Sequence, residues 1–191
     1  LRKEENKQYT GMYLSEIAAA MGKEWVDALI DLIVSEEGGP PTIYFMMSEK
    51  NVALQLAQPW MKFGTDAGGA DPGRSGTLIH PRAYGTFPRI LGKYVREERI
   101  MSLEEAIRKM TSAVTNRLSI QDRGLLREGY FADIVVFNPA TISDMATYEQ
   151  PHQVSQGMRW VLVNGTVVLR AGEHTGALPG RILRGPGFVP Q

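Results

Sequence analysis

Apolar residues recur at helical spacing in two stretches near the start of the chain. The first predicted helix covers 14–21, where apolar side chains lie three and four residues apart, and Gly22 interrupts it. The second covers 26–33 and ends at the glycine and proline run 38–41. Both helices have one apolar and one polar face, so each is expected to pack through a single side.

Two short apolar runs further on predict strands of a parallel sheet. Residues 42–47 form a continuous run rich in aromatic and β-branched residues, which is typical of a strand buried on both faces. A short helix is predicted over 49–58 and a second strand over 61–65. Two more helices are predicted, one starting near Pro88 and one behind the capping box 102–105. This alternation of strands and helices indicates parallel strands covered by helices.

The carboxy-terminal part changes to a series of short strands. These are predicted over 132–137, 160–163 and 167–170. Asn164-Gly165 between the last two favours a tight hairpin turn, because both residues accept a positive φ. The glycine- and proline-rich tail from Thr175 is expected to be extended and held only by packing onto something else.

Composition and charge narrow the class of protein. The chain has 191 residues with 21 basic and 21 acidic side chains, and this balance argues against nucleic acid or an anionic membrane as partner. There is no cysteine, so His, Asp, Glu or another chain would have to hold any metal. The polar start is unlike a signal peptide, and no apolar run reaches the roughly twenty residues of a membrane span. A cytoplasmic protein is predicted.

Asp66 is the first candidate for chemistry. It follows the predicted strand 61–65 and opens a glycine-rich loop over 67–77. A carboxylate at the carboxyl end of a barrel strand can move a proton at an active site, and it can also ligate a metal. The alternative is that Asp66 only caps a turn beside Gly68-Gly69. The long irregular loop favours the catalytic interpretation.

The stretch 80–89, with sequence HPRAYGTFPR, supplies the candidates for substrate binding. Arg82 or Arg89 could hold a substrate carboxylate in a bidentate fork, or either could form a surface ion pair with Glu97 or Glu98. His80 could line a pocket or simply end a loop. Tyr84, like Phe87 after it, could line that pocket or pack in the core.

Other polar side chains are interpreted as structural. The remaining histidines, His152 and His174, lie in polar, turn-like stretches and are predicted to be ordinary surface residues. The three histidines form no HxH or HExxH pair, so their spacing builds no metal site. Ser48 is predicted to cap the helix that follows it.

In this order the motifs resemble a known family. Gly64-Thr65-Asp66, then HPRAYGTFPR over 80–89, then GYFADIVVF over 129–137 and the ending GEHTGALPGR over 172–181 are similar to the carboxy-terminal portion of N-acyl-D-amino-acid deacylases. These enzymes belong to the amidohydrolase superfamily. The match runs over nearly the whole chain, and HPRAYGTFPR is its most specific part.

The resemblance implies a fold and a site. The fold class is α/β, with the last two or so strand–helix units of a metal-dependent-hydrolase TIM barrel over 1–120 and part of a small β-sandwich with an extended tail over 121–191. An eight-stranded barrel takes about 250 residues, so the rest is expected upstream or in another chain. Asp66 is implied as the acid/base and a candidate metal ligand. The complete enzyme is expected to hold zinc, and this chain alone none.

Three functions remain open from the sequence. The first is metal-dependent hydrolysis of the amide bond of small N-acyl-D-amino acids, with Asp66 moving the proton and Arg82, His80 and Tyr84 contacting the substrate. The second is hydrolysis of cyclic amides, as in hydantoinases or dihydroorotases. The third is a catalytically inactive fragment or binding module, because the metal ligands of the family have no counterpart here.

Overall fold

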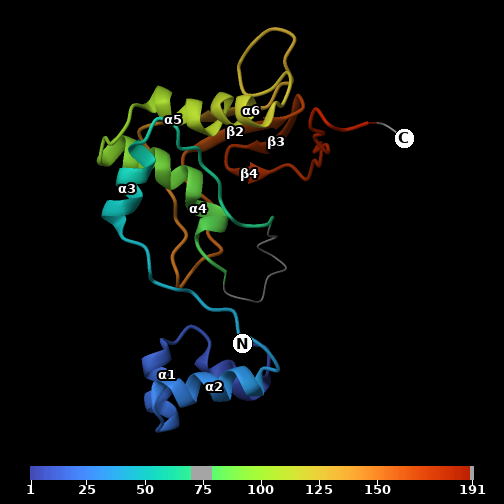
Figure 1. Cartoon of the computed structure of the whole chain (residues 1–191). Coiled ribbons are helices and arrows are strands. Elements are labelled where there is room, and N and C mark those ends of the chain that lie inside the picture. The colour runs from blue at the N-terminus through green and yellow to red at the C-terminus, as the bar shows by residue number, and fades with distance from the viewer. Residues whose placement is uncertain (70–78, 190–191) are drawn as a thin grey trace. The chain divides into compact units, whose positions relative to one another are not determined.

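The computed structural model describes residues 1–69 and 79–189 (Figure 1). The predicted glycine-rich loop 67–77 therefore lies largely outside the described residues. The chain divides into two compact units, Leu1–Met46 and Met47–Gln191. No helix within the described ranges is both long and apolar enough to cross a membrane.

The first unit contains three helices. They are the 3-10 helix η1 (Glu4–Tyr9), α1 (Leu14–Met21) and α2 (Trp25–Ser35), so both helices predicted from apolar spacing are confirmed. The carboxylate of Glu36 accepts hydrogen bonds from the Asn6 side chain and from the backbone N–H groups of Arg2 and Lys3. The bond from Asn6, followed by that from Arg2, lowers the pKa of Glu36, because these donors favour the charged carboxylate.

The helices of the second unit surround its apolar core. They are α3 (Glu49–Ala57), α4 (Arg82–Arg89), the π-helix η2 (Ile90–Glu97) that continues α4, α5 (Leu103–Met110) and α6 (Ser112–Leu118). Ser48 caps α3 and Ser102 caps α5, each accepting a backbone N–H three residues on, as predicted. The buried core consists of Ile90, Leu91, Tyr94, Ala106 and Ile142.

The helix predicted to start near Pro88 begins six residues earlier, at Arg82. Pro81 is its N-cap, and Nδ1 of His80, the residue before it, accepts the backbone N–H of Arg82 at 3.1 Å. Pro88 therefore lies inside a helix, where it has no N–H to donate. The π-helical turns of η2 follow directly after it, from Ile90.

One antiparallel sheet follows, with strand order β1-β2-β3-β4. Its strands are β1 (Ile134–Phe137), β2 (Met158–Val163), β3 (Thr166–Arg170) and β4 (Glu173–His174). The predicted hairpin is confirmed: Asn164 and Gly165 both have positive φ, 49° and 81°, and join β2 to β3. The short β4 was not predicted.

The two strands expected over 42–47 and 61–65 do not form among the described residues. Tyr44, Phe45 and Met47 are exposed, and Met46 is 80% exposed, whereas burial on both faces was predicted. A strand needs a neighbour for its backbone hydrogen bonds, and the described part of the chain supplies none at these positions. The α/β class is confirmed, while the barrel and the sandwich remain predictions.

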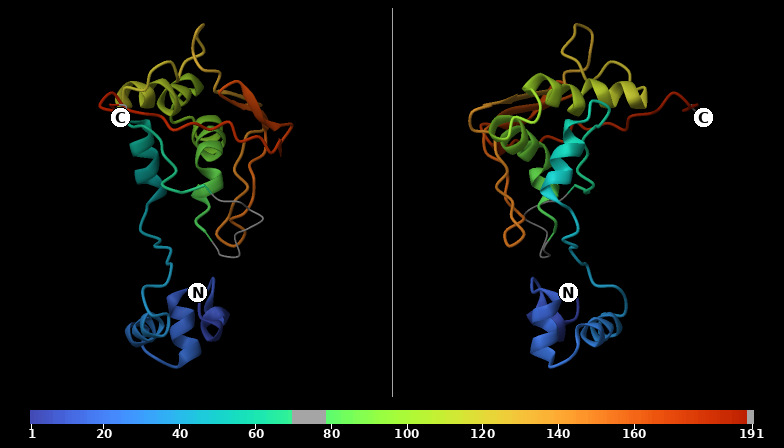
Figure 2. Two further views of the ribbon diagram at one scale, coloured as in Figure 1. Left: turned by 90° about the vertical axis from the view of Figure 1, so that its right-hand side faces the viewer. Right: turned by 60° about the vertical axis from the view of Figure 1, so that its left-hand side comes forward.

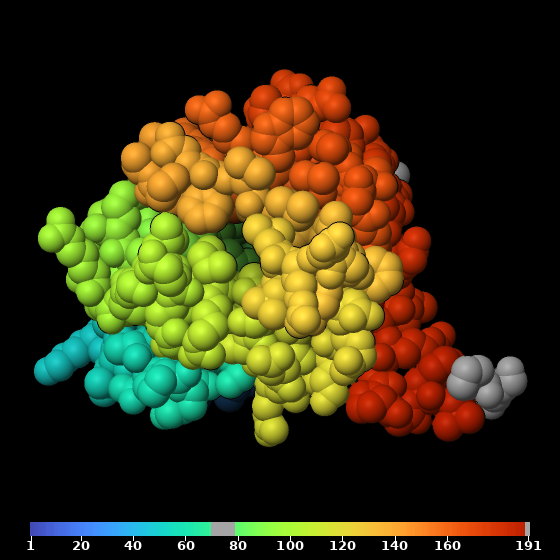
Figure 3. Space-filling view, turned by 90° about the horizontal axis from the view of Figure 1, so that it is seen from above, coloured from blue at the N-terminus to red at the C-terminus, as the bar shows by residue number. Residues whose placement is uncertain are grey.

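The connection between β1 and β2, residues 138–157, is the part of the second unit that matters most for the site. It leaves the sheet and runs beside α4, as the two orientations in Figure 2 agree. Seen from above, α5 and α6 lie next to residues 119–133 and the sheet (Figure 3). The close approach of this connection to η2 needs Gly92, where a Cβ would lie 2.7 Å from the Ile142 carbonyl oxygen.

Candidate active site

Asp66 lies in an irregular stretch and presents its carboxylate to solvent. Its side chain is 88% exposed, and Nη2 of Arg82 is 2.8 Å from its Oδ2. The backbone of Asp66 is in the left-handed region at φ 48°, a conformation that aspartate tolerates better than most residues. The structure thus brings together two residues that the sequence proposed separately.

Arg82 occupies the first position of α4, and this placement turns its side chain to Asp66. The alternative ion pairs expected from the sequence are wrong. Glu97 pairs with Arg96 at 2.8 Å, and Glu98 lies 3.6 Å from Lys93.

Arg89 joins three segments of the second unit. Its Nη2 is 3.4 Å from Glu49 at the start of α3, and its Nη1 is 3.1 Å from Asp144 in the β1–β2 connection. Glu49 also accepts from Lys93 and from the Tyr94 hydroxyl, at 2.6 and 2.8 Å. The bonds from Lys93 and then Tyr94 lower the pKa of Glu49, because these donors favour the charged carboxylate.

His80 is half-buried and has a defined tautomer. Because Nδ1 accepts the backbone N–H of Arg82, the ring proton is at Nε2, which lies 3.4 Å from the hydroxyl of Tyr148. The two rings meet edge to face with centroids 5.2 Å apart. Burial, and then the charge of Arg82, lower the pKa of His80, which favours this neutral imidazole.

Tyr84 contacts His152, a residue that the sequence placed on the surface. The Tyr84 hydroxyl is 3.3 Å from Nδ1 of His152, the rings meet edge to face, and His152 is half-buried. In the sequence, a histidine and a tyrosine lie four residues apart in both segments, at 80 and 84 and at 148 and 152. This shared spacing is the sequence feature that could have indicated the two pairs. His174 is exposed, as expected.

The described residues do not fit a zinc site on their own. No group of three His, Asp or Glu side chains that could hold a metal occurs in ranges 1–69 and 79–189. Asp66 offers one oxygen ligand, whereas His80 and His152 face tyrosines. Any metal beside Asp66 would need ligands from other residues.

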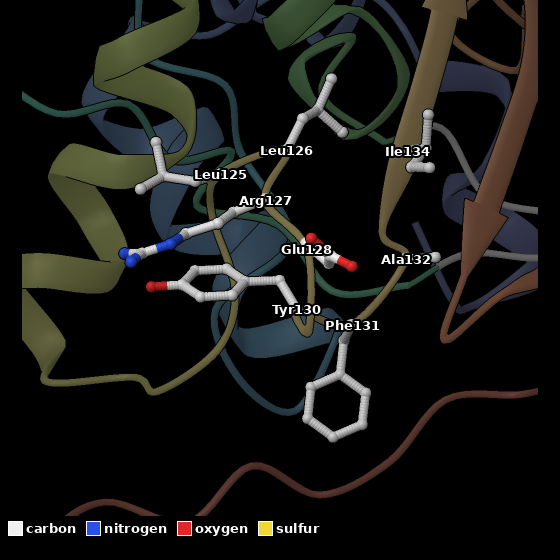
Figure 4. Close-up of a pocket in the computed structure, with 8 residues that line it drawn as sticks. All are labelled: Leu125, Leu126, Arg127, Glu128, Tyr130, Phe131, Ala132 and Ile134. Carbon is white, nitrogen blue, oxygen red and sulfur yellow. The ribbon is translucent and has the colours of Figure 1, made fainter.

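A depression of the described residues lies elsewhere. It has a volume of about 300 Å³ and is lined by Leu125, Leu126, Arg127, Glu128, Tyr130, Phe131, Ala132 and Ile134 (Figure 4). None of the four candidate residues lines it. At the candidate site, the side chain of Asp66 is 88% exposed and that of Arg82 is 43% exposed.

Comparison with known families shows which family the chain belongs to. The sequence model described as "Amidohydrolase family" matches residues 51–169, which is more than half of the chain, so the chain belongs to this family. The matched segment includes Asp66, HPRAYGTFPR and the β1–β2 connection.

Individual relatives define the similarity more closely. The D-aminoacylase of Alcaligenes xylosoxydans xylosoxydans is 41% identical over 176 residues, which are 92% of this chain and 34% of that protein. A crystal structure of D-aminoacylase matches with a TM-score of 0.82 at 38% identity, over 94% of this chain and 36% of that one.

A second structure comes from Bordetella bronchiseptica. Its N-acyl-D-glutamate deacylase, complexed with zinc and a phosphonate mimic of the tetrahedral intermediate, matches with a TM-score of 0.71 at 38% identity. This match covers 82% of this chain and 31% of that one. The chain spans about a third of the length of these relatives.

Proposed function

We propose that this chain forms the carboxy-terminal part of an N-acyl-D-amino-acid deacylase, which hydrolyses a linear amide to a carboxylate and a free D-amino acid. The observation that carries the proposal is the similarity to D-aminoacylase along nearly the whole chain, with an identity of 41%. The exposed carboxylate of Asp66 beside Arg82 supports it. The rest of the enzyme is supplied by preceding polypeptide or by another chain.

Asp66 is proposed as the acid/base. One carboxylate oxygen accepts a proton from water while the water oxygen bonds to the amide carbonyl carbon. The protonated Asp66 then gives this proton to the amide nitrogen as the C–N bond breaks, which restores the carboxylate. Zinc is proposed for the complete enzyme, with ligands drawn mainly from residues outside the described part of this chain.

Arg82 is proposed to hold the substrate carboxylate. A guanidinium carries five N–H donors, so pairing with Asp66 through Nη2 leaves donors for a second carboxylate. A substrate held in this way has its amide near Asp66. His80 and Tyr84 were expected to touch the substrate, and their contacts with Tyr148 and His152 favour a supporting role.

The division of the complete enzyme stays as predicted from the sequence. Residues 1–120 are proposed to complete the barrel and residues 121–191 to belong to the sandwich, although the chain by itself divides after Met46. Association with the remaining barrel would give 42–47 and 61–65 the strand neighbours that they lack here. The cytoplasmic location also remains a prediction.

Asp66→Asn in the complete enzyme tests the acid/base role. Turnover of an N-acetyl-D-amino acid should fall by at least about a hundredfold, because an amide cannot carry the proton. Zinc content and circular dichroism should stay unchanged. Asp122→Asn is the matched control, since Asp122 is also exposed with a positive φ of 56°. Turnover of Asp66→Asn within twofold of the parent enzyme would reject the role.

The alternative activity is tested on the same preparation. We expect hydrolysis of linear N-acyl-D-amino acids and none of hydantoins. Faster hydrolysis of a hydantoin would favour the cyclic-amide reaction instead.

A further inference from the structure

Two histidine–tyrosine pairs join the start of α4 to the β1–β2 connection. His80 faces Tyr148, and four residues further along both segments Tyr84 faces His152. Both pairs are edge-to-face, with centroids 5.2 and 5.8 Å apart. The ion pair of Arg89 with Asp144 adds a third contact at the other end of α4.

The first pair acts directly on the backbone of a candidate site residue. Nδ1 of His80 accepts the N–H of Arg82, one of the donors that a helix start leaves without a helical partner. Nε2–H of His80 points to the hydroxyl of Tyr148. A ring held at both nitrogens has one tautomer and one orientation, so it fixes where α4 begins.

The position of that start decides where the Arg82 side chain goes. Arg82 is the first residue of α4, and its Nη2 is 2.8 Å from Asp66. The side chains of Arg82 and Asp66 are 43% and 88% exposed, and an exposed ion pair of this kind contributes little by itself. The pair therefore depends on the backbone being held in place, which is what His80 and Tyr148 do.

We propose that His80 and Tyr148 are positioning residues, which hold the start of α4 so that Arg82 orients the carboxylate of Asp66. This inference rests on the proposed function. It assigns a role in the site to the β1–β2 connection, which contacts His80 through Tyr148. It also gives His80 a role different from substrate contact.

The kinetic test compares His80→Ala, His80→Asn and Tyr148→Phe in the complete enzyme. His80→Ala should lower kcat about ten- to a hundredfold with KM within about threefold, because small displacements of catalytic groups reduce the rate of the chemical step. Asn keeps an acceptor for the Arg82 N–H, as Asn does at helix starts, and should restore most of kcat. Tyr148→Phe keeps the ring and removes the hydroxyl, and should lower kcat about threefold or more.

His174→Ala is the matched control. Nδ1 of His174, an exposed residue of β4, accepts the backbone N–H of Gly176 at 3.0 Å. His80 accepts the same kind of hydrogen bond from Arg82, which also lies two residues after the histidine. The kcat of His174→Ala should equal that of the parent enzyme. Equal kcat for His80→Ala and the parent would overturn the proposal. A rise in KM without a fall in kcat would also overturn it, by making His80 a substrate contact.

A spectroscopic measurement keeps the inference separate from the proposed function. Side-chain ¹⁵N shifts at neutral pH should show His80 protonated at Nε2 and unprotonated at Nδ1, whether or not the protein hydrolyses N-acyl-D-amino acids. The opposite tautomer would overturn the positioning role even in an active enzyme. An inactive parent enzyme with the expected tautomer would reject the deacylase function and with it the catalytic meaning of the contact.

Discussion

At the scale of single residues, the site is a small chain of contacts from Tyr148 through His80 and Arg82 to Asp66. Each member has a different task. Asp66 carries the proposed proton transfer, Arg82 supplies positive charge, and the neutral imidazole of His80 orients Arg82. The sequence predicted three of these residues. His80 and Arg82 come from the motif 80–89, and Asp66 precedes the glycine-rich loop. Tyr148 could not be predicted, because it lies 68 residues from His80.

The protonation of His80 gives a prediction at this scale. Burial lowers its pKa below the ordinary value of about 6.5, so the unfolded chain takes up the proton first as the pH falls. The stabilisation due to neutral His80 should be complete above about pH 6.5 and be lost as the pH falls through the lower folded-state pKa. An NMR titration should give a His80 pKa below 6.5.

As a control for this titration, the free energy of unfolding of His80→Asn is measured against pH and compared with that of the parent protein. The variant should lack the part of the acid destabilisation that comes from His80. A His80 pKa above 6.5, or identical pH profiles for the two proteins, would contradict the expectation.

At the scale of elements, turn and capping residues correctly predicted turns and helix starts. The prediction failed for strands, which need a neighbouring strand from a distant part of the sequence. Asn164-Gly165 encodes the hairpin turn, and the serines before residues 49 and 103 mark the starts of α3 and α5. These elements could therefore be predicted from the sequence. The run 42–47 has the residues of a buried strand but no neighbouring strand among the described residues, and it stays irregular. The early start of α4 was missed because its N-cap is Pro81, which makes no side-chain cap hydrogen bond and is not a usual capping residue.

Lys109 provides a test at the element scale. Its side chain is fully buried, and Nζ donates to the Leu56 carbonyl at 2.7 Å, in the last turn of α3. Such carbonyls lack a helical partner, so Lys109 ties α5 to the end of α3. Lys109→Met should reduce the free energy of unfolding by about 1–3 kcal/mol, because it leaves this oxygen unpaired.

Urea denaturation measures this effect. Lys50→Met is the control, since Lys50 is exposed on α3 and its replacement should change stability by less than about 0.5 kcal/mol. Equal stability of Lys109→Met and the parent would show that Leu56 finds another donor.

At the scale of the whole molecule, the chain exposes an apolar segment. Tyr44, Phe45, Met46 and Met47 are all more than half exposed. Surfaces of this kind promote association. The isolated 191-residue chain should therefore form species larger than a monomer in analytical ultracentrifugation at tens of micromolar, an order-of-magnitude figure for such association.

A double substitution tests this expectation. Tyr44→Lys with Met46→Lys should shift the chain toward the monomer, because two charges oppose burial of the segment. Leu178→Lys is the control, since Leu178 is 89% exposed in the tail and should leave association unchanged. If the double variant associates as strongly as the parent chain, the association involves a surface other than residues 44–47.

The bridge made by Arg89 also has a consequence for the order of events during translation. Its guanidinium meets Glu49, which precedes it, and Asp144, which is synthesised 55 residues after it. At about 5–20 residues per second, Asp144 leaves the peptidyl-transferase centre roughly 3–11 s later. Glu49 is already present when Arg89 is added, whereas the contact of Arg89 with Asp144 can form only after this interval.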